Sequence, residues 1–298
     1  MDSANKVLQL NYKSQQTGFA QMKSLVIAAL SICLLFNLAA TPVQAEDVFA
    51  DKNLEKVVRK YVFAKRNNEE PLTAADVENI SSIEGSGVGI TNLAGLEKCR
   101  SLAQLILADN EITDVGALAG LKNIQSLNLA GNKISDLAAL ANLEALQYLK
   151  LSNNEISDLT PLKALTNLRS LYLSGNQIQN TAAIAELKKL WSLYLDGNKI
   201  TNIDSLSGLT RVSSLDLRNN KVVDLAPLAK FTELKYLLLT GNEVVDLSIL
   251  VEMATADSDG QKRFSPFWKI YVSDNPLGRD VRKQLNKLGS LGARIHSD

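Results

Sequence analysis

The side chains used most often for acid–base, nucleophilic or metal chemistry are scarce in this sequence. Its 298 residues include one histidine, His296, and two widely separated cysteines, Cys33 and Cys99. One histidine near the C-terminus offers little scope for a general base, and two cysteines make neither a CxxC cluster nor a disulfide framework. No nucleophile elbow of the form G-x-S-x-G and no phosphate-binding loop is present either. We therefore expect no enzyme activity, no metal site and no cofactor.

The charge balance narrows the possible partners. Lysine plus arginine and aspartate plus glutamate both count 32, so the formal net charge is zero. A nucleic-acid-binding or membrane-surface protein usually carries a clustered basic excess. We expect no nucleic-acid partner. The apolar content of 46% is enough to bury a sizeable core, whereas the aromatic content is only 5%.

An internal repeat dictates where any binding residue must lie. Asparagines recur every 22 residues at Asn110, Asn132, Asn154, Asn176, Asn198, Asn220 and Asn242. Each lies in the pattern L-x-x-L-x-L-x-x-N-x-I, as from Leu146 to Ile156. An eighth asparagine, Asn275, follows after 33 residues, because about eleven extra residues occupy 254–264. A degenerate first repeat begins near Ile80, with Val88 in place of the asparagine.

This pattern resembles the leucine-rich repeat family over residues 80–277. The 22-residue length is similar to the subgroup that includes bacterial internalins and the eukaryotic phosphatase-regulatory repeats. The resemblance implies an α/β solenoid with a concave parallel β-sheet, convex 3-10 or irregular turns, and helical caps at both ends. It also implies a protein-binding module with no active site of its own.

The repeat residues account for such a fold physically. Leucines two apart, such as Leu149 and Leu151, point into the core, and one coil alone cannot bury its apolar side. Each asparagine is expected to turn the chain and to bond backbone groups of the adjacent coil. At the apolar positions, Cys99 is predicted to be a buried small hydrophobe. Thr181 also takes such a position and predicts a local irregularity.

A second polar column follows each asparagine by four residues. It comprises Asp114, Asp136, Asp158, Asn180, Asn202, Asp224 and Asp246. We expect these side chains to cap short 3-10 segments on the convex side. Calcium binding is the weaker interpretation, because one carboxylate per coil gives a row spaced by about 4.8 Å rather than a convergent cage.

The outward positions of the strands gather most of the large aromatic residues. Residues two, four and six before each asparagine face the concave surface, since those three and five before it point inward. Five of the seven tyrosines fall there: Tyr148, Tyr172, Tyr194, Tyr236 and Tyr271. Both tryptophans, Trp191 and Trp268, lie seven residues before an asparagine. Strand propensity explains part of this enrichment, but exposed aromatics on one surface favour a binding face.

The candidate partner-binding residues surround the middle and C-terminal strands. They are Tyr148, Lys150, Arg169, Tyr172, Trp191, Tyr194, Asp216, Arg218, Tyr236, Trp268 and Tyr271. Tyr172 and Tyr194 occupy the same position on adjacent strands, so their rings should lie side by side. Arg169 and Trp191 are placed for a cation–π contact. Asp196 and Arg218 are placed for an ion pair.

Both ends of the repeat array need covers. Residues 46–79 carry a helical stripe that includes Leu54, Val57, Val58, Tyr61 and Val62, and a second short helix is predicted at 74–77. Residues 278–298 are predicted to form a C-terminal cap helix and tail. The helical face there carries Val281, Leu285 and Leu288.

The N-terminal segment has the three parts of a signal peptide. Met22 and Lys23 precede the apolar run Leu25–Phe36, and Val43-Gln44-Ala45 precedes the expected cut. We interpret 22–45 as the signal peptide and 1–21 as an upstream or leader extension. The apolar run is short for a membrane span, which disfavours a retained anchor. The protein is therefore expected to be exported, periplasmic or secreted, without stable membrane insertion after cleavage.

Together these features predict an exported, non-enzymatic recognition module that binds a protein through the concave aromatic residues. Three alternatives stay open. One is a glycan-binding protein of the envelope or cell wall, because aromatic faces also stack on sugars. The others are a self-assembling structural protein and an intracellular phosphatase-regulator-like scaffold, which the leader opposes. A monomer is expected over an oligomer.

The leader makes the first testable prediction. Cleavage after Ala45 should leave Glu46 as the N-terminal residue of the protein purified from its native cell envelope, as read by mass spectrometry. Recovery of the intact leader on protein in the cytosol would contradict export.

Overall fold

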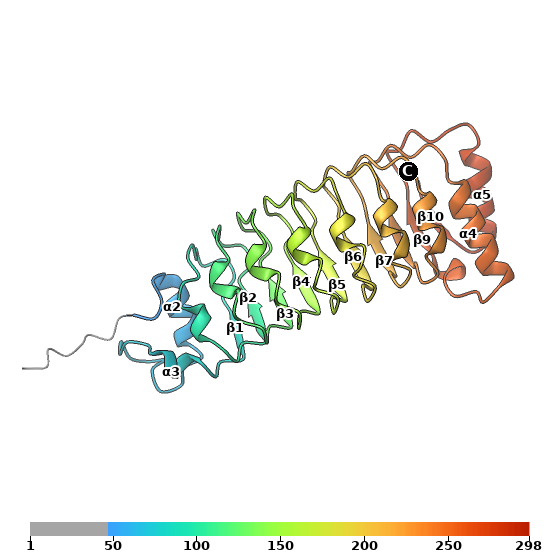
Figure 1. Ribbon diagram of the computed structural model, residues 1–298. Coiled ribbons are helices and arrows are strands. Elements are labelled where there is room, and N and C mark those ends of the chain that lie inside the picture. The colour runs from blue at the N-terminus through green and yellow to red at the C-terminus, as the bar shows by residue number, and fades with distance from the viewer. Residues whose placement is uncertain (1–46, 298) are drawn as a thin grey trace, which may run out of the picture. The chain divides into compact units, whose positions relative to one another are not determined.

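The computed structural model describes residues 47–297, and the predicted leader lies outside them. The described chain is a stack of coils with one ten-stranded parallel sheet, in which each strand pairs with the next in sequence (Figure 1). The strands are β1 (Ser82–Glu84), β2 (Gln104–Ile106), β3 (Ser126–Asn128), β4 (Tyr148–Lys150), β5 (Ser170–Tyr172), β6 (Ser192–Tyr194), β7 (Ser214–Asp216), β8 (Tyr236–Leu238), β9 (Lys269–Tyr271) and β10 (Arg294–His296). The predicted solenoid is confirmed.

Short helices form the layer opposite the sheet, as the sequence predicts. Seven 3-10 helices follow β1 to β7: η1 (Leu96–Lys98), η2 (Gly116–Leu118), η3 (Ala138–Leu140), η4 (Thr160–Leu162), η5 (Ala182–Ile184), η6 (Asp204–Gly208) and η7 (Ala226–Lys230). After β8 comes α4 (Ser248–Asp259), which occupies most of the expected insertion, and then η8 (Ser265–Phe267). The sheet and the helices enclose one continuous apolar core.

The inward columns are fully buried in every middle coil. In the coil of β4, the side chains of Leu149, Leu151, Ile156 and Leu162 are all 0% exposed. Strand register stacks each such leucine on its equivalent, as with Leu149 beside Leu171. Each coil thus buries its apolar side only against neighbouring coils, which is how a repeat array acquires stability.

A ladder of buried asparagine amides joins the coils along one edge of the sheet. The Asn176 side-chain nitrogen donates to the Leu151 carbonyl of the preceding coil at 3.0 Å and to the Leu173 carbonyl of its own coil at 3.0 Å. Its oxygen accepts from the Ile156 backbone N–H, also in the preceding coil, at 3.0 Å. Asn110 makes the equivalent bonds to the first coil, so Val88 does not interrupt the ladder. The predicted role of the asparagine column is confirmed.

The residue just before each ladder asparagine adopts the left-handed conformation. It is glycine in half of the coils, with φ between +65° and +71°, and it is Asp109, Asn153, Asn219 or Asp274 in the others. These are the residue types that tolerate positive φ. In each coil with a ladder asparagine, the turn out of the strand therefore restricts the residue type at two consecutive positions.

The second polar column bonds the first N–H of the 3-10 helices, although each of its residues lies one position before the N-cap rather than at it. The Asp136 carboxylate accepts from the Ala138 backbone N–H at 2.8 Å, and the equivalent bond recurs at Asp158 and Asn180. Thr181 does not disturb the backbone, which contradicts the expected irregularity. Its buried hydroxyl is satisfied by the Ser205 hydroxyl at 2.6 Å.

Helices cover the N-terminal end of the core. α2 (Lys52–Arg59) buries Leu54, Val57 and Val58, and α3 (Ala74–Val77) buries Val77. Tyr61 departs from the predicted buried stripe, because α2 ends before it. It is 42% exposed, and its hydroxyl accepts from the backbone N–H of Glu84 in β1 at 2.9 Å.

The C-terminal end is covered by α5 (Val281–Ser290), as predicted, and also by a strand that the sequence analysis missed. After α5 the chain returns to the sheet as β10, which pairs with β9 through Ile295 opposite Ile270. Across residues 47–297, the helices are all too short or too polar to cross a bilayer.

The asparagine ladder predicts that two asparagine substitutions lower the stability of the protein by different amounts. Asn176→Ala should lower the free energy of unfolding by about 2 kcal/mol, because it leaves the buried Ile156 N–H without a partner. It also removes one of the two amide donors to the Leu151 carbonyl, which the Asn154 amide still bonds. Asn167→Ala is the control, since its amide reaches the Glu144 carbonyl at the exposed surface. Its cost should stay below about 1 kcal/mol. Chemical denaturation measures both, and equal effects would contradict the role given to the ladder.

The left-handed turns predict a second contrast. Gly197→Ala should destabilise the protein by about 1 kcal/mol, because φ is +65° there although the new Cβ would meet only ordinary contacts. Gly120 lies in open space without positive φ, so Gly120→Ala should be neutral or stabilise by up to about 1 kcal/mol. Thermal or denaturant unfolding of the pair tests this, and a tolerated alanine at residue 197 would refute it.

Candidate partner-binding surface

Three tyrosines from adjacent strands form a packed row on the open face of the sheet. Tyr172 and Tyr194, which are opposite in register, stack with ring centroids 4.7 Å apart and planes at 11°. Tyr148 packs on the other side of Tyr172, at 5.3 Å and 44°. Burial raises the pKa of the Tyr148 and Tyr172 hydroxyls above the usual value. We call these three residues the tyrosine cluster; the predicted side-by-side pair is present within it.

The middle ring of the tyrosine cluster has an aromatic neighbour on each side. Tyr172 is stacked on Tyr194 and meets Tyr148 at a tilt of 44°. The Tyr194 hydroxyl accepts from the Ser214 hydroxyl of the next strand at 3.0 Å. The cluster therefore offers a partner aromatic rings and hydroxyl groups that are held in place by their packing. Lys150 flanks it, half-buried and opposite Tyr172 in register.

Arg218 borders the tyrosine cluster, and the carboxylate of Asp216 holds its guanidinium in one orientation. Its Nε and Nη2 donate to the two carboxylate oxygens of Asp216, at 3.0 Å and 2.6 Å, and the bond to the carboxylate raises the pKa of Arg218. The predicted pair between Arg218 and Asp196 is wrong; Asp196 instead accepts from the Ser174 hydroxyl at 2.5 Å. The Asp216 side chain is only 1% exposed, whereas that of Arg218 is 43% exposed. Asp216 thus orients Arg218 and is itself too buried to contact a partner.

Arg169 and Trp191 lie beside the tyrosine cluster, just before their strands begin. Trp191 is 49% exposed. The expected cation–π contact between the two is absent from the described residues, where such contacts join Lys269 to Tyr236 and Arg66 to Phe63. Arg169 instead lines a shallow depression with Gln147 and Asn167. The guanidinium is thereby left available on the surface.

Trp268 does not belong to the surface, which corrects the sequence-based expectation. Its side chain is 0% exposed and meets Phe264 edge-on, with centroids 5.1 Å apart. The insertion contributes to this burial, because it supplies Phe264, in the segment between α4 and η8 that replaces the regular return of the coil. Phe267 is exposed in its place.

The C-terminal strands add aromatic and basic groups, some of which the sequence analysis missed. Tyr271 stacks on His296 of β10 with centroids 4.2 Å apart and planes at 8°. The Lys269 ammonium lies 5.2 Å from the ring centre of Tyr236. The sequence analysis places His296 in a tail because β10 has no ladder asparagine. The signal available in the sequence is the alternation of apolar Ala293 and Ile295 with polar Arg294 and His296.

We find no cluster of reactive side chains within residues 47–297. Burial raises the pKa of the Cys99 thiol to about 12, so this residue is a core hydrophobe as expected. Within residues 47–297, histidine, cysteine and carboxylate side chains form no group of three able to hold a metal ion.

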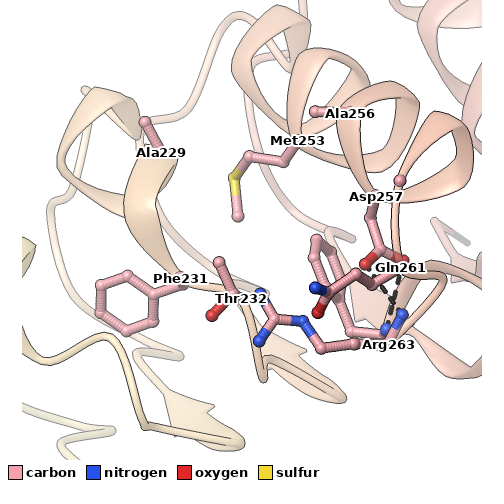
Figure 2. Close-up of a pocket in the computed structure, with 10 residues that line it drawn as sticks. Ala229, Phe231, Thr232, Met253, Ala256, Asp257, Gln261 and Arg263 are labelled. Carbon is pink, nitrogen blue, oxygen red and sulfur yellow. Dashed lines mark hydrogen bonds between the residues drawn. The ribbon is translucent and has the colours of Figure 1, made fainter.

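One pocket lies away from the sheet face, between η7 and α4 (Figure 2). It has a volume of about 260 Å³ and is lined by Phe231, Met253 and Asp257, among others. The Asp257 carboxylate accepts from the backbone N–H groups of Arg263 and Ser265, both at 2.9 Å. These bonds close the loop after α4, so Asp257 serves the fold of the insertion.

Known proteins that resemble this chain have the same repeat sequence and the same solenoid fold. The family of Leucine Rich repeats (2 copies) matches residues 100–142, 144–189 and 188–230. The structure of internalin C2 from Listeria monocytogenes is 30% identical with a TM-score of 0.66, over 78% of this chain and 93% of that chain. The internalin InlF from the same species is 24% identical with a TM-score of 0.50, over 88% and 93%. No curated protein matches the chain in sequence.

A plant structure shows how widely the fold extends. The ectodomain of the receptor kinase GASSHO1/SCHENGEN3 from Arabidopsis thaliana, solved with CASPARIAN STRIP INTEGRITY FACTOR 2, is 22% identical with a TM-score of 0.59, over 72% of this chain and 26% of that one. The chain belongs to the leucine-rich repeat family. Within that family it is internalin-like, since its repeats and its likeness to internalin C2 agree. Leucine-rich repeat proteins generally act as protein-interaction modules rather than as enzymes.

Proposed function

We propose that this chain is an exported, non-enzymatic recognition module that binds a protein partner through the open face of its sheet. The observation that carries the proposal is the tyrosine cluster. Tyrosines are among the side chains that dominate binding energy at protein interfaces. Three of them are packed together on a solvent-facing sheet, in a chain with few aromatic residues.

The bordering residues support a protein interface. Lys150 and Arg169 add positive charge beside the cluster, and Arg218 is held in place by Asp216. A side chain already fixed in position loses less entropy when a partner binds. Trp191, 49% exposed at the side of the cluster, is a candidate anchor of its own. Tyr236 and Tyr271 extend the aromatic surface toward the C-terminal end.

The ring geometry favours a protein over a glycan. Stacking on a sugar requires an open aromatic face, and Tyr172 is stacked on Tyr194 on one side with Tyr148 tilted against the other. The exposed parts of the rings and their hydroxyls are suited to hydrogen bonds and van der Waals contacts with a polypeptide. Export rests on the leader pattern at 22–45, and the protein is proposed to be periplasmic or secreted and monomeric. Light scattering on the purified protein tests self-assembly.

The tyrosine cluster predicts a binding defect without a folding defect. Tyr172→Ala and Tyr194→Ala should each weaken capture of the natural partner by at least about tenfold, because central aromatic anchors typically contribute about 2 kcal/mol or more. The partner is to be identified by pull-down from envelope extracts, set against a glycan array, and then titrated with each variant.

The outward residues Gln104 and Gln125 of the N-terminal strands supply the controls. Gln104→Ala and Gln125→Ala should leave partner affinity unchanged, and thermal melts of all four variants should resemble that of the unmodified protein. Equal affinities for the tyrosine and glutamine variants would show that the tyrosines serve strand packing alone.

A further inference from the structure

The C-terminal end of the sheet carries a compact set of cations. Lys269 of β9 lies opposite Arg294 of β10 in register, and Lys235 precedes β8 by one residue. The backbone places Lys235 beside this pair, since the Lys269 N–H donates to its carbonyl at 2.8 Å. We call Lys235, Lys269 and Arg294 the C-terminal basic surface.

These cations are not neutralised by nearby acids. Within residues 47–297, none of the three forms an ion pair. Two carboxylates on or before the neighbouring strands β7 and β8 are engaged elsewhere, Asp216 with Arg218 and Glu233 with Arg263. Asp274 lies at the opposite end of β9. The three positive charges therefore remain available for an external anion.

The N-terminal end of the sheet has no comparable set of cations. The outward residues of β1 to β3 include Glu84, Gln104 and Asn128 and contain no lysine or arginine; Lys150 of β4 is the first. The open face is thus acidic or neutral where the chain enters the sheet and basic where it leaves. A partner that complements this gradient docks in one direction only.

Aromatic rings lie among the cations. Lys269 lies over the Tyr236 ring, which limits the freedom of its ammonium group, and the Tyr271–His296 stack lies one row away. A polypeptide segment can place carboxylates on the cations and apolar atoms on the rings. A nucleic acid favours a longer basic stripe than three clustered side chains, on a chain with a basic excess that this one lacks.

We propose that the C-terminal basic surface binds an acidic peptide segment of the protein partner. This inference rests on the proposed function, since it takes the open sheet face as the place of docking. The inference adds the chemistry of the bound segment, which carries carboxylates spaced to reach Lys269 and Arg294 together. It also places that segment beyond the tyrosine cluster, toward the C-terminal end of the sheet.

A direct binding assay tests the proposal. The probe is a fluorescein-labelled peptide of alternating glutamate and serine, titrated in low-salt buffer by fluorescence anisotropy. The double variant Lys269→Gln, Arg294→Gln should bind it at least about tenfold more weakly, and Lys269→Arg should retain affinity. Added salt should weaken binding to the unmodified protein, because exposed charges are screened.

A matched variant separates a site from net charge. Lys122→Gln with Lys163→Gln removes the same charge from exposed positions on the convex side and should leave affinity unchanged. An equal loss in both double variants would overturn the proposal. So would no binding of the peptide to the unmodified protein, equal binding of a glutamine–serine peptide, or tighter binding of a single-stranded oligothymidylate that depends on the same residues.

The two proposals fail in different ways. Tyr172→Ala should not change the affinity for the acidic peptide, although it should weaken the natural partner. Loss of peptide binding in Tyr172→Ala would mean that the acidic segment does not occupy a separate surface. An intact peptide affinity in Lys269→Gln, Arg294→Gln would refute the basic surface and leave the tyrosine cluster to its own test.

Discussion

Burial between coils is the interaction on which the whole molecule depends. No coil has a core of its own, so every leucine column exists only because the next coil continues it. Strand pairing and the asparagine ladder keep those columns aligned, since the buried amide of Asn176 is bonded to two backbone groups of the preceding coil. A shift of one coil against another would break these bonds and misplace the leucines at once. The rigidity of the sheet follows from this double constraint.

The rigid sheet in turn fixes the positions of its outward side chains. The backbone fixes the spacing of Tyr172 and Tyr194, so the rings stack without a change in the fold. Asp216 occupies an outward position but lies buried beneath Arg218, whose guanidinium it holds. The open face thus carries groups whose positions are set before any partner arrives, and this limits the entropy lost on binding.

The parts of the fold with regular periodicity could be predicted from the sequence. Leu149 is buried and Tyr172 is outward because one repeat dictates both directions. Trp268 could not be placed, since its surroundings come from the insertion, where the period is broken. The partner of Arg218 could not be chosen either, because Asp196 on the neighbouring strand and Asp216 on its own strand were both in reach. β10 escaped prediction because it lacks the ladder asparagine that marks the other strand ends.

The asparagine ladder also gives the stack a polarity. Each side-chain oxygen accepts from an N–H of the coil before it, as Asn275 does from Val244 at 3.0 Å, so every coil relies on its successor to complete its turn. Loss of coils from the C-terminal side would uncover buried N–H groups in the coil that becomes terminal. Loss from the N-terminal side would instead leave the N–H that bonds the next asparagine still paired in the new first coil. Its own asparagine amide would lose an acceptor, as would the backbone N–H groups that donate backward, such as Gln147 to Gln125 and Glu155 to Ile134. Shortening the array is therefore not equivalent at its two ends. The natural C-terminal cover follows the last of a series of asparagine side chains that all bond backward to the preceding coil.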